Sequence, residues 1–189
     1  MSDEGKKILE LFQQTRKVCQ QFALLLSTAE AQMEKKDWEG ERTNAISDMS
    51  KSVLYPSYWI PIAAFRLFNK TKCPNRLGFI SILIDDHWDA KYVLKEPIIT
   101  AGFFDYGKGK VNGDWEYSFT RIYGYLAEKH NLKPDGEVFH FSRSMVSPSH
   151  KGNFKSGVVF ALPLVSIENS EDIKLKITDK LLNLIESKG

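Results

Sequence analysis

The first fifth of the chain carries an apolar stripe with the spacing of a long amphipathic helix. Its residues lie alternately four and three positions apart, as in helices that pack along a seam. They are Ile8, Phe12, Thr15, Cys19, Phe22, Leu26, Ala29 and Met33. Leu11, Val18 and Leu25 widen the stripe, and neither Gly nor Pro occurs between Lys6 and Lys36. The sequence therefore predicts one helix of about 30 residues, roughly 45 Å long.

A helix of this length extends past a small domain, so its stripe needs a surface to pack on. We favour packing along the sheet of its own domain. The alternative is pairing with the same helix of a second chain, or with a partner protein. The contact residues would then be Ile8, Phe12, Cys19, Phe22, Leu26 and Met33. We accordingly divide the chain into a long N-terminal helix, 1–37, and a single α+β domain, 38–189.

Composition bounds the class of protein. The chain of 189 residues is 42% hydrophobic and 26% charged, as in ordinary globular proteins that build one core. No apolar run reaches the roughly 18 residues that span a bilayer, and the N-terminus does not resemble a signal peptide, so we expect a cytoplasmic protein without membrane contact. The net charge of +2 is too small to indicate nucleic-acid binding by itself. Cys19 and Cys73 lack the neighbouring ligands of a zinc site, and we expect free thiols.

The remaining segments alternate between strand and helix patterns. Strands are predicted at 62–68, 77–84, 97–106, 137–143 and 157–167, from their β-branched and aromatic residues and bounding turns. A short helix is the alternative at 62–68. A helix is predicted from Trp115 to His130, and a last helix is predicted to begin with Ser170 as its cap. The polar connection after Trp38 is expected to hold a short helix at 44–54.

This order predicts an α+β fold. We expect about five strands in a mainly antiparallel sheet, with helices on one face and the long N-terminal helix added. The layout resembles that of small sensory domains of the GAF and PAS types. The resemblance is one of layout alone and implies no particular function.

A polar cluster follows the second predicted strand. Asp85, Asp86, His87 and Asp89 could hold a divalent metal or supply acid–base chemistry if they converged in space. No second cluster of potential ligands accompanies them, and Asp-rich strand ends commonly form turns. We therefore favour a solvated turn, predict no metal site, and keep Asp86 and His87 only as weak catalytic candidates.

A second weak candidate is His140, which precedes Ser142 and Arg143 on a predicted strand. A strand histidine beside Ser and Arg could act as a general base or bind phosphate oxygens. Phosphoesterases built on two such strands would need a second His-x-Ser/Thr motif, and this chain has none. A half-buried histidine bonded to the backbone is the favoured interpretation. Phosphate-binding, nucleophile-elbow and HExxH motifs are also absent, so no cofactor is assigned.

The charge distribution is the most informative functional signal. If the middle strands form a meander and the last two a hairpin, the loops 70–76, 107–113 and 143–156 share one end of the sheet. These loops contain no Asp or Glu. Their basic residues are Lys70, Lys72, Arg76, Lys108, Lys110, Arg143, Lys151 and Lys155. The acidic cluster after the second strand would lie at the opposite end.

Three hypotheses follow. The first is a non-enzymatic binding, sensing or interaction module that meets an anionic ligand, such as a nucleotide or nucleic acid, at the basic loops. The second is an enzyme acting on a phosphate-containing substrate through His140 and Arg143. The third is a structural subunit that docks through its N-terminal helix. We favour the first, because the basic and acidic clusters are expected at opposite ends of the sheet.

Overall fold

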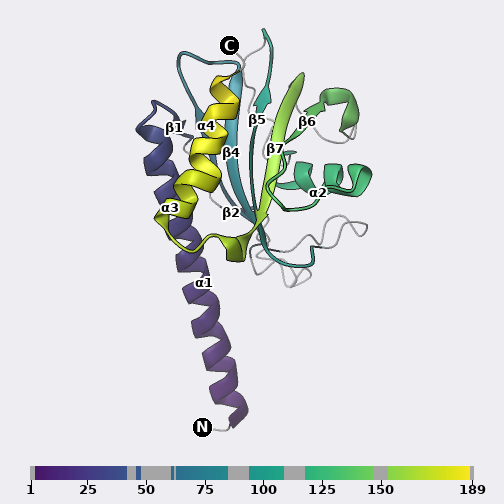
Figure 1. Cartoon of the computed structure of the whole chain (residues 1–189). Coiled ribbons are helices and arrows are strands. Elements are labelled where there is room, and N and C mark those ends of the chain that lie inside the picture. The colour runs from purple at the N-terminus through teal and green to yellow at the C-terminus, as the bar shows by residue number, and fades with distance from the viewer. Residues whose placement is uncertain are drawn as a thin grey trace.

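The computed structural model describes residues 3–41, 46–47, 61, 63–84, 94–108, 118–146 and 153–187. Its centre is a seven-stranded sheet in the order β1-β3-β4-β5-β7-β6, with β2 also paired to β3 and every pairing antiparallel (Figure 1). The strands are β1 (Glu39–Gly40), β2 (Ile46–Ser47), β3 (Ala63–Asn69), β4 (Arg76–Leu83), β5 (Ile98–Asp105), β6 (Phe139–Ser142) and β7 (Ser156–Pro163). The helices are α1 (Asp3–Glu34), α2 (Ser118–His130), α3 (Ser170–Asp172) and α4 (Asp179–Glu186). The predicted α+β class is confirmed.

Three details differ from the expectation. The sheet has seven strands, because the short β1 and β2 extend it beyond β3. Within the segment predicted as a short helix at 44–54, Ile46–Ser47 is a strand paired with β3, and the rest lies outside the described residues. Helices also cover both faces of the sheet, because the strands bury apolar side chains on each side.

The alternation of side chains along β4 defines the two faces. Phe79 packs with residues of α2, including Ile122 and Leu126. Its neighbour Ile80 points the other way and packs with residues of α1 and α4, including Leu26 and Leu181. Neighbouring strand residues point to opposite faces, so α2 lies on one face and α1 with α4 on the other (Figure 1).

The C-terminal helix contains a π-helical turn, Ile173–Thr178, between α3 and α4. Its buried residues Ile173, Ile177, Leu181 and Ile185 are each four positions apart, a spacing that drifts around an α-helix. The wider π turn counteracts this drift, so the four residues stay on the sheet side. The helix is capped by Asn169, whose side chain accepts hydrogen bonds from the amides of Glu171 and Asp172, and not by Ser170 as predicted.

The long N-terminal helix is confirmed, and it has two environments. From Phe22 onward its stripe is buried against the sheet, with Ala29 and Met33 fully covered. Glu30 pairs with Arg66 of β3 at 3.0 Å, and Gln32 accepts a hydrogen bond from Thr178 at 2.7 Å. The part before Phe22 extends past the sheet into solvent (Figure 1). The expectation of packing along its own sheet therefore describes only the second part of α1.

Candidate functional site

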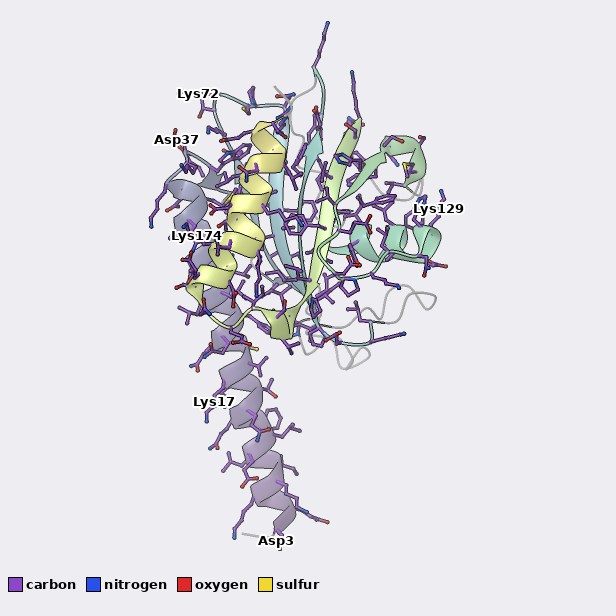
Figure 2. All side chains as sticks on the ribbon, in the orientation of Figure 1. Asp3, Lys17, Asp37, Lys72, Lys129 and Lys174 are labelled. Carbon is purple, nitrogen blue, oxygen red and sulfur yellow. The ribbon has the colours of Figure 1, made fainter. Side chains whose placement is uncertain are left out.

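The projecting part of α1, residues 3–21, carries a row of exposed apolar side chains. Five of them are about half exposed or more: Ile8 at 58%, Leu9 at 48%, Leu11 at 63%, Phe12 at 62% and Val18 at 47%. Cys19 is an exposed free thiol on the same row. Figure 2 shows that the stretch of α1 between Asp3 and Lys17 projects away from the other described elements. We call this surface the α1 stripe.

Two cavities flank α1 where the stripe meets the domain. One, of about 390 Å³, lies between α1 and the segment that leads into α3, and it is lined by apolar residues that include Leu24, Leu25, Leu164 and Ile167. The other, of about 110 Å³, lies between α1 and the sheet and includes Cys19, Phe22 and Ala64 in its lining. Apolar surface therefore continues from the α1 stripe onto the domain.

Sequence reasoning missed the domain part of this surface. Leu24 on α1 and Val165 after β7 are 60% and 74% exposed. Val165 belongs to a predicted strand, where burial is the default, and the observed 3-10 turn Leu164–Ser166 places it in solvent. The cavity joins residues more than 100 positions apart, so no local pattern could have indicated it.

At the other end of the sheet, strand register brings the basic loops together. Arg76 at the start of β4 pairs with Asp105 at the end of β5, and Asp105 pairs with Ser156 at the start of β7. Ser142 at the end of β6 also pairs with Ser156. The described parts of the three loops therefore lie at one end, and Figure 2 shows Lys72 there, far from the α1 stripe.

Two of the predicted basic residues at this end are held by carboxylates. Arg76 is buried, lies 3.8 Å from Asp105 and donates a hydrogen bond to the carbonyl of Ile185. Lys70 contacts Glu186 at 3.0 Å and lies over the ring of Trp38. This contact with Lys70 lowers the pKa of Glu186, so the carboxylate is charged at neutral pH. Both cations therefore have structural partners.

The other basic residues differ in placement. Lys72, Lys108 and Lys155 are exposed. Arg143 stacks over Phe154, with its guanidinium 5.4 Å from the ring centroid, and is partly buried. Lys110 and Lys151 lie outside the described residues. Burial raises the pKa of Tyr106, which follows β5, to about 12, so the phenol stays neutral at this end.

The catalytic candidates are not assembled into a cleft by the described part of the chain. His140 is exposed on β6, which is an edge strand, so the expectation of a half-buried histidine is not met. Neither cavity beside α1 is lined by His140 or Arg143. The segment 85–89, with Asp86 and His87, lies outside the described residues. Within the described ranges no three His, Cys, Asp or Glu side chains gather as metal ligands.

The described helices and the comparisons with known proteins add two findings. Among the described residues, no helix combines the length and apolar character that a membrane crossing requires. Neither protein-family models, nor curated proteins, nor solved structures gave a match to this chain.

Proposed function

We propose that the protein is a non-enzymatic interaction module that docks on another polypeptide through the α1 stripe. One observation carries the proposal: large apolar side chains are exposed on a helix that extends past its own domain, with Leu11 at 63% and Phe12 at 62%. Contiguous exposed apolar surface of this kind marks interaction sites in folded proteins.

The stability of the helix itself supports docking. Helical segments gain most of their stability from packing an amphipathic face, and short ones without such packing are marginal in water. Most of residues 3–21 are exposed, and only towards the end of this stretch do Cys19 and Gln21 line the cavities that α1 shares with the domain. A partner that covers the stripe would supply the missing burial, worth about 1.5–3 kcal/mol for each large side chain that becomes fully buried.

Site-specific photo-cross-linking in the cells that make the protein tests this proposal. Phe12 is replaced by benzoyl-phenylalanine, and the matched control carries the same group at Gln13, on the polar face of α1. We expect a discrete cross-linked species from position 12 that is lost when Val18→Glu is added, because a charge on the stripe opposes burial. Absence of any adduct at position 12, or equal yields at positions 12 and 13, would contradict docking through the stripe.

A second candidate function is binding of a phosphate-bearing ligand at the basic end of the sheet. The supporting observation is that Lys72, Lys108 and Lys155 are exposed on loops that strand register brings to the same end. Several lysines acting together would attract a polyanion although the net charge is only +2. The enzyme alternative, with His140 and Arg143, has weaker support because His140 lies exposed on an edge strand.

A further inference from the structure

The α1 stripe has the spacing of a surface that pairs with a second helix. Four central residues follow one another at intervals of four, three and four: Ile8, Phe12, Thr15 and Cys19. Side chains at these intervals lie on one face of a helix, and a facing helix fills the holes between them. Leu11 and Val18 flank the row on one side and widen it. The spacing of the stripe therefore fits a helical partner.

The direction of that partner follows from the way α1 meets its own sheet. The row continues without a break into Phe22 and Leu26, which are 8% and 2% exposed because the sheet covers them. A parallel helix in register would run along this same face into the space that the sheet occupies. An antiparallel helix runs the opposite way and carries its own domain to the far end of the pair. Only the antiparallel direction keeps each domain from overlapping the helix of the other copy.

We infer that the partner is a second copy of this chain, bound through the α1 stripe as an antiparallel helix pair; this inference rests on the proposed docking role of α1. One twofold register places Ile8 opposite Cys19, and Phe12 opposite Thr15, of the second copy. Each layer then joins a large side chain to a small one, which is how facing positions interdigitate. A parallel pair would instead place Phe12 against Phe12 and the polar Thr15 against Thr15.

The same register also gives favourable pairings for the residues at the ends and on the flank of the stripe. It brings Gly5 of one copy opposite Phe22 of the other, where the domain begins and a side chain has least room. The twofold axis also makes equivalent sides of the two helices meet, so Leu11 lies beside Val18 of the second copy. The stripe is thus complementary to itself.

Sedimentation of the purified full chain is the first test. We expect wild-type protein to form a species of twice 21.6 kDa. Phe12→Glu should raise the dimer dissociation constant at least ~30-fold, the effect of losing a side chain at an interface hot spot. Gln13→Glu adds the same charge on the polar face and should leave the dimer intact. Because both positions are exposed in the single chain, the domain of each variant should still unfold in one cooperative transition.

Disulfide mapping tests the direction. In a Cys73→Ser background, Ile8→Cys is oxidised with diamide and the bonded peptides are identified by mass spectrometry. The antiparallel register predicts a bond between the new thiol and Cys19 of the second copy. A dimer in which Cys19 bonds only to Cys19 would overturn the inferred pairing.

The outcomes separate this inference from the proposed function. Wild-type protein that remains monomeric up to its solubility limit overturns the second copy as partner. If a photo-cross-link at position 12 to a different protein is then found, docking through the stripe survives without self-association. If no adduct forms either, both proposals fail.

Discussion

Gly102 shows how a single residue sets the packing of the sheet. It lies on β5 opposite Val159 of β7, and a Cβ atom built at this position would overlap the carbonyl oxygen of Val158. The same atom would approach Phe79 Cζ at 3.0 Å. The obstacle is mainly backbone, which cannot rotate away as a flexible side chain would. Glycine is therefore required here for the close approach of β5 and β7.

We expect Gly102→Ala to lower the free energy of unfolding by about 1–3 kcal/mol, the usual cost of overpacking a core. Gly78→Ala on β4 is the matched control, since its nearest neighbour would be Ile185 Cδ1 at 3.5 Å, an ordinary contact. The control should change the stability by less than about 1 kcal/mol. Urea denaturation of both variants measures the difference. Equal unfolding midpoints for the two variants would show that the close approach of β5 and β7 does not require glycine at position 102.

At the scale of elements, the end of α4 ties together segments from both ends of the chain. Glu186 accepts hydrogen bonds from Lys70, which follows β3, at 3.0 Å and from the indole of the buried Trp38, which follows α1, at 3.3 Å. Lys70 also donates to the carbonyl of Lys36 at 2.8 Å. A single carboxylate therefore connects α1, the β3–β4 turn and α4.

This connection should depend on pH. Lys70 lowers the pKa of Glu186 below its ordinary value of 4.5. A lowered folded-state pKa gives stability that is present above about pH 4.5 and is lost as the pH falls through the folded-state value. Because the Glu186 side chain is 47% exposed, the contribution at neutral pH should be under about 1 kcal/mol.

Glu186→Gln should therefore destabilise the protein at pH 7 and have a smaller effect at pH 3, measured by urea denaturation at both values. Glu137→Gln is the matched control, since that side chain is exposed and lies outside the helices. The control should show little effect at either pH. A difference between wild type and Glu186→Gln that is the same at both pH values would contradict the assigned role of the charge.

At the scale of the whole molecule, apolar and basic surfaces lie at opposite ends. The α1 stripe extends past the end of the sheet where β4 finishes, whereas Lys72 lies at the end where β4 begins (Figures 1 and 2). A second copy bound at the stripe therefore leaves both basic ends accessible. The two candidate functions do not compete for the same surface.

The basic end gives a prediction about salt. Binding of a single-stranded oligonucleotide should weaken steeply as salt rises, because phosphates that pair with lysines release condensed counterions. The triple variant Lys72→Glu, Lys108→Glu and Lys155→Glu should lose this binding in fluorescence anisotropy. Its control, Lys17→Glu, Lys95→Glu and Lys133→Glu, changes the net charge equally at other exposed sites. Absence of wild-type binding at low salt, or equal loss in both triple variants, would rule out a specific basic site.

The sequence by itself determined the fold class and the longer elements, but not the short strands β1 and β2. Four-and-three spacing defined α1, and β-rich runs between turns defined β3, β4 and β5, because hydrophobic periodicity is a local property of the chain. It also indicated that the basic loops would share one end, since an antiparallel meander returns every second loop to the same edge. The exposed stripe residues other than Leu9 were named from their spacing alone.

Only the tertiary structure decided which of these residues are available to a partner. Lys70 looks like a free surface cation in the sequence, yet it pairs with Glu186, 116 positions away. Ile8 and Leu26 belong to the same row, but the sheet ends between them, so one is exposed and the other buried. Whether a charge is neutralised or an apolar side chain covered depends on contacts between segments distant in the sequence, and no local pattern contains that information.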